Sequence, residues 1–277
     1  MLKTFLCAIA ICFSLINAGC ATNPITGKSE LMLVSEEQAN EIGEKYAPEV
    51  EKQLGGAIED QQIQNYVQSV GDRVVRASHT PEEDFTFTAV NDPSINAMAL
   101  PNGQIFITRG MLEAVSNEAQ LASILAHETA HVTARHVASA MSTQIGISIL
   151  MQVASRTVDI PAGAQTIANY SRQLISLKFS RNDERQADIG GLEYLVDAGY
   201  DPQAMTQTMD ILAEKSGSRI EFLSSHPNPG TRSDYLKERI SQGNYPANLR
   251  TGRQAYQENV LDRLNALPQP QETTEKN

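Results

Sequence analysis

Hydrophobic and polar positions recur with two different periods along this chain. Val67, Val70 and Val74 are spaced as on one face of a helix, whereas Phe85 to Val90 alternates residue by residue, as in a strand. Extended over the chain, the pattern predicts helices at 35–51, 63–77, 183–198, 202–215 and 231–242, a further helix from residue 168 onward, and strands at 85–90, 97–100 and 104–108. These elements indicate a mostly helical α+β fold with a small antiparallel sheet.

The two ends of the chain differ in composition from the rest. Residues 1–18 carry one charge, Lys3, and an apolar run too short for a membrane span, as in a secretory signal. This run ends at Ala18-Gly19-Cys20, which is similar to a bacterial lipobox except for Asn17; the alternative is an ordinary signal peptide cut nearby. We therefore expect a lipoprotein signal peptide at 1–19, a polar tether at 20–34, one domain at 35–266 and a disordered tail at 267–277.

Cysteine usage and charge exclude several classes of protein. If Cys20 becomes the lipidated first residue, Cys7 and Cys12 are removed and the mature chain has no free thiol. This excludes a cysteine protease and a Cys-ligated zinc site. With 22 basic and 33 acidic residues the net charge is −11, so no nucleic-acid partner is expected. By analogy with lipoproteins, Ala21 after the cysteine favours the outer membrane.

One internal segment, residues 144–154, is apolar and carries no charge. We expect a buried or lid helix there. The alternative is a surface that faces a membrane or a substrate, although the segment is too short to span a bilayer.

The sequence His127-Glu128-Thr129-Ala130-His131 carries the main chemical signal. It follows a stretch of good helix formers that Ser116 or Asn117 can cap. On a helix, two imidazoles four residues apart lie about 40° apart, at roughly 100° per residue, so both can reach one zinc ion. Glu128 between them can hold a water without binding the metal, as in zinc peptidases with an H-E-x-x-H motif.

The environment of this helix supports the same interpretation. Leu121, Ile124, Leu125 and Val132 form one apolar stripe that should face the core, and Glu128 lies within it. A carboxylate on an apolar face is costly unless something binds it or its proton. The alternative is a buried salt-bridge helix with incidental histidines.

A catalytic zinc needs a third protein ligand and an open position. Only His79, His136 and His226 remain among the histidines. On a continuous helix His136 would point away from His127, so we expect it to be a hydrogen-bonded structural residue. The metzincin extension is absent, since Ala134 and Val137 replace its glycine and histidine. Residue chemistry alone leaves His226 and four carboxylates open as the third ligand: Asp183, Glu184, Asp188 and Glu193.

The order of motifs resembles the gluzincin metallopeptidases related to the CAAX prenyl proteases and HtpX, in their periplasmic lipoprotein branch (LoiP- and BepA-like). The resemblance covers most of the chain after Cys20. No internal repeat is visible, so the helical-repeat domain of some relatives is not expected. The resemblance rests on Asn23-Pro24-x-Thr26-Gly27, Asn96-Ala97-x-Ala99-Leu100-Pro101-x-Gly103, His127-Glu128-x-x-His131-x-x-x-Arg135-His136, Ser180-Arg181-x-x-Glu184-x-x-Ala187-Asp188, Ala198-Gly199-Tyr200-Asp201-Pro202 and Ser225-His226-Pro227.

This resemblance implies roles for particular residues. It makes Glu184 the third zinc ligand beside His127 and His131, with Asp188 as its companion. Gln186 replaces a glutamate of many relatives, which should not affect ligation. His226 in the His-Pro loop would stabilise an oxyanion or occupy the open position in a resting form; alternatively it only caps a turn. Arg232 would orient this loop or a carboxylate.

The implied activity is that of a zinc-dependent endopeptidase with one Zn²⁺ per chain and Glu128 as general base. If 104–108 is an edge strand, an extended substrate can add to it through main-chain hydrogen bonds. Such binding suits unfolded or misassembled envelope proteins. We expect a periplasmic protein, lipid-anchored at the inner face of the outer membrane, and contact with the outer-membrane assembly machinery. The rival function is a chaperone or assembly factor with a latent or structural zinc site.

Overall fold

The computed structural model describes residues 19–32, 35–143, 164–215, 221–227 and 229–270. The expected signal sequence up to residue 18, the apolar segment 144–154 and the tail beyond residue 270 lie outside these ranges. Among the described residues, no helix has both the length and the apolar character that crossing a bilayer requires.

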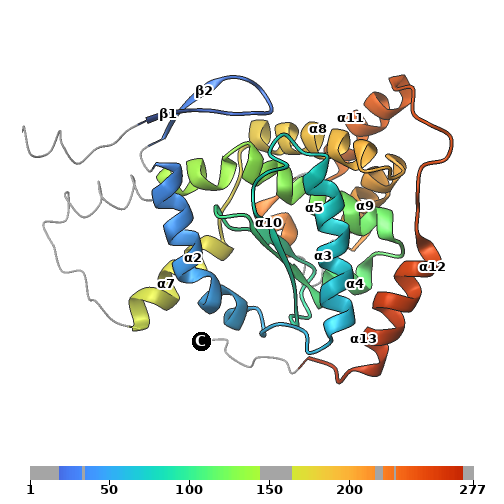
Figure 1. Cartoon of the computed structure of the whole chain (residues 1–277), viewed down its shortest axis with the longest axis horizontal. Helices are drawn as coiled ribbons and strands as arrows, with labels where there is room; N and C mark the ends of the chain where they lie inside the picture. The colour runs from blue at the N-terminus through green and yellow to red at the C-terminus, as the bar shows by residue number, and fades with distance from the viewer. Residues whose placement is uncertain (1–18, 33–34, 144–163, 216–220, 228, 271–277) are drawn as a thin grey trace, which may run out of the picture.

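Helices make up most of the fold, as expected (Figure 1). The predicted long helices are present, with ends that differ from the predicted ones by a few residues. Ser35 and Asn117 cap their helices with side-chain hydrogen bonds, and Gly199 follows one with φ of +85°. The helices are α2 (Glu36–Gln53), α3 (Gln61–Arg76), α4 (Arg109–Ala114), α5 (Glu118–Thr133), α7 (Ala164–Ile175), α8 (Arg181–Asp197), α9 (Gln203–Glu214), α10 (Phe222–Ser225), α11 (Pro229–Gln242), α12 (Arg253–Tyr256), the π-helical turn η1 (Gln257–Leu261) and α13 (Asp262–Ala266).

The central sheet has three strands: β3 (Thr86–Val90), β4 (Ala97–Ala99) and β5 (Gln104–Thr108), in the order β3-β5-β4. The sheet is mixed, not antiparallel throughout, because β3 runs parallel to β5 and only β4 is antiparallel to it. The expectation that residues 104–108 form an edge strand is wrong, since β5 is the middle strand. Period-two alternation indicates which face of a strand is buried, and it carries no information about the order of the strands.

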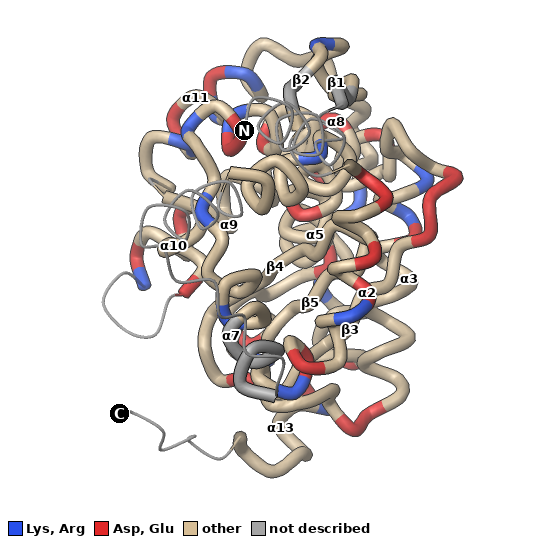
Figure 2. The backbone as a smooth tube through the Cα atoms, turned by 90° about the vertical axis from the view of Figure 1, so that its left-hand side faces the viewer, with Lys and Arg blue, Asp and Glu red and all other residues tan. Residues whose placement is uncertain are grey.

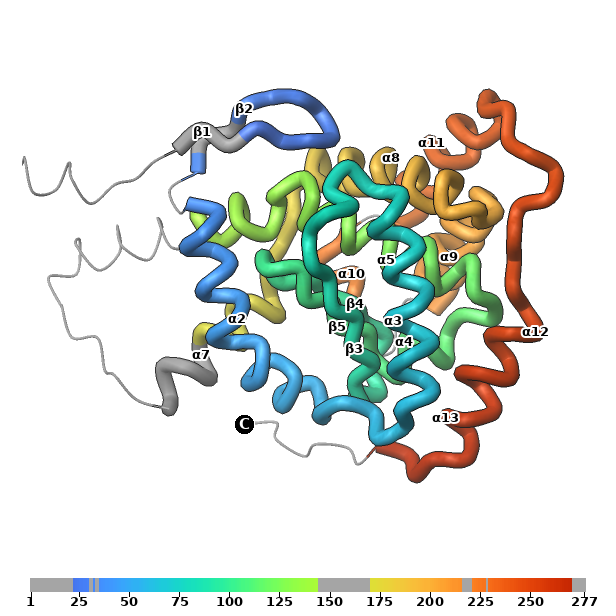
Figure 3. The backbone as a smooth tube through the Cα atoms, viewed as in Figure 1, coloured from blue at the N-terminus to red at the C-terminus, as the bar shows by residue number. Residues whose placement is uncertain are grey.

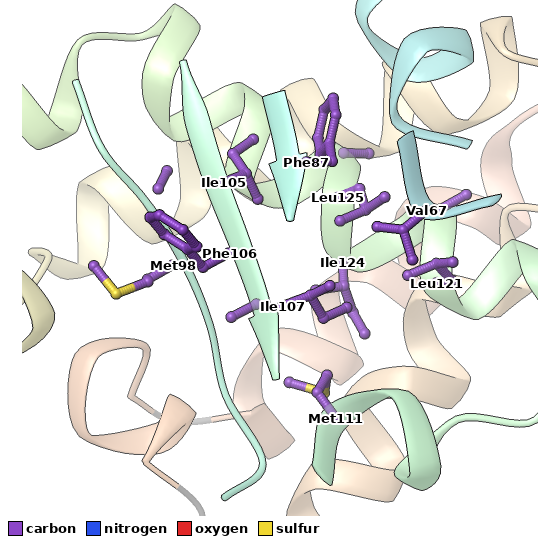
Figure 4. Close-up of a cluster of buried hydrophobic side chains, with 14 of the residues drawn as sticks. Val67, Phe87, Met98, Ile105, Phe106, Ile107, Met111, Leu121, Ile124 and Leu125 are labelled. Atoms are coloured by element: carbon purple, nitrogen blue, oxygen red, sulfur yellow. The ribbon is translucent and has the colours of Figure 1, made fainter. Parts of the chain in front are cut away.

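Both faces of β5 are covered, which explains its nearly unbroken apolar sequence. Ile105 and Ile107 pack with side chains of α5, and Phe106 points to the other face beside Met98 (Figure 4). The helix α5 is buried along its whole length, so the expected single apolar stripe underestimates its burial. It packs against the sheet, α3, α8 and α9.

Helix α8 approaches α5 closely because it carries glycine at the crossing. A Cβ on Gly191 would lie 3.1 Å from the Cα of His127. This backbone approach brings the first turns of α8, which carry Glu184, next to the motif on α5.

The residues expected to form a tether contain a two-stranded antiparallel hairpin, β1 (Gly19–Thr22) and β2 (Ser29–Met32). Gly27 in the connecting turn has φ of +67°, a backbone conformation that glycine adopts without strain. The hairpin lies over the region where α8 begins (Figures 1 and 3).

The segment from α12 to α13 packs beside α3 and α4 and has no counterpart in the predicted elements. Arg109 is buried there and donates hydrogen bonds to the carbonyl oxygens of Leu264 at 2.8 Å and Pro268 at 2.6 Å.

On the outer helices, such as α2, acidic and basic residues are interspersed (Figure 2).

Candidate metal centre

Helix α5 carries the motif into the core of the protein. His127, Glu128 and His131 are all buried. The Nε2 atoms of the two histidines lie 3.1 Å apart, so the spacing of four residues does direct both imidazoles to one point.

Helix α8 supplies a carboxylate at the same point. A reciprocal capping box between Ser180 and Asp183 starts the helix just before Glu184. Glu184 Oε1 lies 3.3 Å from His131 Nε2, and its Oε2 lies 3.6 Å from His127 Nε2. Asp183 serves in the helix cap, and Glu193 is not among the converging donor groups either.

His226, at the end of α10, is the fourth donor. Its Nδ1 lies 2.8 Å from Glu184 Oε1 and 3.2 Å from His127 Nε2. One donor atom from each of four residues lies within 4.8 Å of the others: His127, His131, Glu184 and His226. The ring of Phe222 stacks on His226 with centroids 4.3 Å apart, which orients the imidazole within the cluster.

Asp188 and Arg232 surround the cluster. Asp188 Oδ1 lies 3.0 Å from His127 Nδ1. Arg232 donates to both Asp188 oxygens, at 2.8 Å from Nε and 2.6 Å from Nη2, and its Nη1 lies 2.5 Å from Glu184 Oε2. Tyr235 also donates to Asp188. Sequence reasoning missed Tyr235, whose spacing from Arg232 gives no signal by itself.

The electrostatics of these buried groups follow from their partners. Burial alone would raise the pKa of Glu184, but the nearby His226 and His131 hold it well below its usual range. Burial would also raise the pKa of Asp188, but the charge of Arg232 holds this pKa well below its usual range. Burial, together with the charge of Arg232, lowers the pKa of His127 to about 3. The carboxylates are therefore ionised and His127 is neutral at neutral pH.

Glu128 differs from the other two carboxylates. Neither of its oxygens has a hydrogen-bond partner among the described residues, although both are buried. Burial, reinforced by the negative charge of Glu184, raises the pKa of Glu128 to about 7. An unpaired buried carboxyl with a pKa near neutrality has the properties of a general base.

The cluster fits a divalent metal ion. Because the carboxylate of Asp188 can only accept at His127 Nδ1, the lone pair of His127 must be on Nε2, facing His131 Nε2 and Glu184. Donor atoms that converge in this way in a buried site can share one cation. Imidazole nitrogens and a carboxylate oxygen are the donors found in zinc sites.

His136 lies elsewhere than expected. The helix α5 is not continuous to this residue, because Arg135 has φ of +61° and interrupts it. His136 Nδ1 is therefore 3.1 Å from His131 Nδ1, and its Nε2 is 3.3 Å from Gln186 Oε1. Its pKa is lowered to about 4 by burial and by nearby His131. It is hydrogen-bonded, as predicted, but it lies beside the cluster and does not point away from it.

His79 is not among the converging donor groups and contacts the hydroxyl of Tyr194 at 2.8 Å. Cys20 lies within strand β1.

A helix that presents two histidines and a glutamate to a carboxylate from a second helix is the arrangement of a metallopeptidase. The model of peptidase family M48 matches residues 61–240. The chain is 32% identical over 237 residues to the beta-barrel assembly-enhancing protease of Escherichia coli, covering 80% of this chain and 47% of that protein. It is also 32% identical over 182 residues to the mitochondrial metalloendopeptidase OMA1 of Arabidopsis thaliana, covering 65% of this chain and 37% of that protein.

The chain belongs to peptidase family M48. This confirms the resemblance on which the expected site was based. The chain spans about half the length of the bacterial relatives it matches. Family membership and the donor cluster together imply a bound metal ion.

Proposed function

We propose that this protein is a zinc-dependent endopeptidase of the bacterial cell envelope that degrades unfolded or misassembled envelope proteins. The observation that carries the proposal is the donor cluster of His127, His131, Glu184 and His226 beside the unpartnered carboxyl of Glu128.

In the proposed reaction His127, His131 and Glu184 would hold the zinc ion. When bound, zinc acts as a Lewis acid that polarises a carbonyl group and makes water a nucleophile near pH 7. Glu128 accepts the proton of the attacking water on a carboxylate oxygen and passes it to the leaving amine. Asp188 orients His127 by accepting its Nδ1 hydrogen, and Arg232 keeps Asp188 ionised.

The position of His226 favours one of the three roles expected for it. Its Nδ1 lies within the donor set, next to Glu184 Oε1 and His127 Nε2. We therefore propose that His226 would be a fourth ligand of the ion in a resting form, and that it must leave for substrate to enter.

The substrate site follows from the observed strand order. Among the described residues β4 pairs only with β5, so its outer edge has no strand partner. Its three residues are buried, so a peptide could reach this edge only after a neighbouring segment moves. This strand also packs against α5, which carries the motif. An extended peptide that adds to β4 by main-chain hydrogen bonds would be recognised mainly through its backbone. Such recognition requires an unfolded segment, which supports a role in removing misassembled proteins.

The envelope location and lipid anchor are further parts of the proposal. The motif at Cys20 supports lipidation, and the bacterial relatives include proteins named beta-barrel assembly-enhancing protease. We propose that the chain is anchored through Cys20 at the periplasmic face of the outer membrane and acts on polypeptides that meet the assembly machinery there.

The decisive experiment compares the wild type with Glu128→Gln. The substitution removes the base and keeps the three ligands, so zinc content should stay at one ion per chain. Cleavage of casein or an unfolded porin should fall by roughly 10²–10⁴-fold. Glu41→Gln, a change at an exposed position of α2, is the matched control and should leave cleavage unchanged. Cleavage by Glu128→Gln at the wild-type rate would show that Glu128 is not the base.

The same variant tests the rival function. One relative is named a beta-barrel assembly-enhancing protease, and the position of His226 in the donor set is compatible with a latent enzyme. If Glu128→Gln fully restores the envelope of a cell that lacks the protein, assembly without proteolysis is the main function. If it fails to do so, proteolysis is required.

A further inference from the structure

The Asn23-Pro24-x-Thr26-Gly27 motif lies in the hairpin between β1 and β2, and the proposed reaction does not use it. Asn23 is buried and its amide has a defined orientation. Its Oδ1 accepts from the backbone N–H groups of Ile25 at 3.0 Å and Thr26 at 3.2 Å. Since these two donors fix the oxygen, the Nδ2 group must be the part that faces Gln186.

Asn23 thereby determines the orientation of Gln186. Asn23 Nδ2 donates to Gln186 Oε1 at 2.8 Å. Turning the Gln186 amide would bring two NH₂ groups together, so the oxygen must be the atom on this side. The same oxygen lies 3.3 Å from His136 Nε2 and can only accept from it. In neutral His136, the hydrogen is therefore on Nε2 and the lone pair is on Nδ1.

The next contact reaches a metal donor. His136 Nδ1 lies 3.1 Å from His131 Nδ1, and one of the two atoms must carry the hydrogen. Because His136 Nδ1 has the lone pair, His131 donates from Nδ1. The lone pair of His131 is then on Nε2, which faces His127 Nε2 and Glu184 Oε1. This is the form of imidazole that can bind a metal through Nε2.

The hairpin is docked on the same helices by independent contacts. Ile25 packs against α8 where a Cβ on Gly190 would lie 2.7 Å from its Cδ1. Arg135, the residue that interrupts the helix after α5, donates to the carbonyl oxygen of Thr22 and to Glu36. Figure 3 shows the hairpin lying over the start of α8. These contacts hold Asn23 at the position where its amide reaches Gln186.

We infer that Asn23 is a positioning residue for the metal centre: through Gln186 and His136, the N-terminal hairpin selects the tautomer of His131 that binds the metal. The inference rests on the metal site of the proposed function. It assigns a positioning role to Asn23 and Gln186, which lie 163 positions apart in the sequence and share one hydrogen bond.

The test is Asn23→Asp. Aspartate keeps the acceptor that Ile25 and Thr26 require and replaces the donor by a second acceptor. Gln186 should then turn its NH₂ group toward residue 23 and His136. This group donates to His136 Nε2, which must accept, and the hydrogen bond between His136 and His131 is reversed. Zn²⁺ affinity, measured by competition with a chromogenic chelator, should fall about 10–100-fold. In the zinc-loaded protein, the hydrogen on His131 Nδ1, followed in ¹⁵N spectra, should exchange with water faster than in the wild type, because His136 Nδ1 no longer accepts it.

Two controls separate this effect from a loss of packing. Gln186→Glu still accepts from both neighbours and should bind Zn²⁺ at least as tightly as the wild type. Asn65→Asp adds the same charge on the exposed face of α3 and should change neither readout. If Asn23→Asp does not fold, Gln186→Leu interrupts the same chain without altering the hairpin and should weaken Zn²⁺ binding in the same way.

Unchanged Zn²⁺ affinity together with unchanged exchange of the His131 Nδ1 hydrogen in Asn23→Asp would overturn the inference. Failure of the wild type to bind Zn²⁺ would instead contradict the proposed function, and the ¹⁵N spectrum of His136, expected to show a hydrogen on Nε2, would still test the hydrogen-bond chain.

Discussion

At the scale of single residues, the histidines of the cluster differ in what holds their second ring nitrogen. His127 Nδ1 contacts the ionised Asp188 at 3.0 Å, and His131 Nδ1 contacts His136 at 3.1 Å. His226 Nε2 lies 3.6 Å from Glu128 Oε1, beyond hydrogen-bonding distance. His226 also comes from a short helix, whereas the other two share α5. Of the donors, His226 is therefore the one best suited to leave.

This difference predicts the effect of His226→Ala. Removing the fourth donor should lower Zn²⁺ affinity and raise the rate at which an unfolded substrate is cleaved, because a coordination position becomes vacant. Steady-state cleavage at saturating Zn²⁺ measures the rate. His79→Ala, outside the cluster, is the control. A tenfold or greater fall in kcat would instead assign His226 to stabilisation of the oxyanion.

The sequence was sufficient for some of these residues and not for others. The spacing of His127, Glu128 and His131 predicted their convergence because a single helix determines it. Glu184 could be selected from four carboxylates only through the resemblance to a family. The partners Asn23, Gln186 and His136 could not be predicted, because their contacts depend on how the hairpin docks and on the helix break at Arg135.

At the scale of elements, the same distinction holds. Helices with a capping residue and an apolar face, such as α2 and α3, lie close to their predicted ranges. The direction of β3 and the central position of β5 were not predictable, because pairing between strands is a tertiary property. The segment from α12 to α13 contains a π-helical turn and few periodic apolar positions, so its pattern gave no helix signal.

One contact between elements predicts a pH dependence of stability. Asp60 caps α3 and pairs with Arg263 of α13 at 2.7 Å. The hydrogen bond from Arg263 outweighs burial and lowers the pKa of Asp60. Since the folded pKa is below the unfolded one, the contribution is complete above about pH 5 and is lost as the pH falls through the folded value.

Asp60→Asn should therefore lower the Tm at pH 7, because asparagine keeps the cap and removes the charge. The difference in Tm from the wild type should shrink steadily between about pH 5 and pH 3. Thermal unfolding followed by circular dichroism measures it. In an Arg263→Gln background the same substitution should have little effect at any pH. A difference that stays constant over this range would contradict the assigned partner.

At the scale of the whole molecule, the donors of the cluster connect separate parts of the fold. His127 and His131 come from α5, Glu184 from α8 and His226 from the end of α10. A metal ion that binds only when these elements are assembled stabilises the native state by about 4 kcal/mol at a free concentration of a thousand times its Kd.

Removal of the metal should therefore lower the Tm of the wild type. Addition of EDTA to zinc-loaded protein, followed by calorimetry, should reveal a clear downward shift that excess Zn²⁺ reverses. His127→Ala should start from a lower Tm and show little further response to EDTA. A wild-type Tm that is insensitive to EDTA would mean that these four side chains do not bind a metal in the native protein.

The distance along the chain between the histidines affects when the enzyme can first act. His226 follows His127 by 99 residues, and Arg232, which balances two buried carboxylates, comes later still. During synthesis, a partly emerged polypeptide has the histidine pair long before it has this arginine. If the proposed function holds, proteolytic activity would arise only after nearly all of the domain had been synthesised and folded. This order would protect the nascent protease and its neighbours from premature digestion.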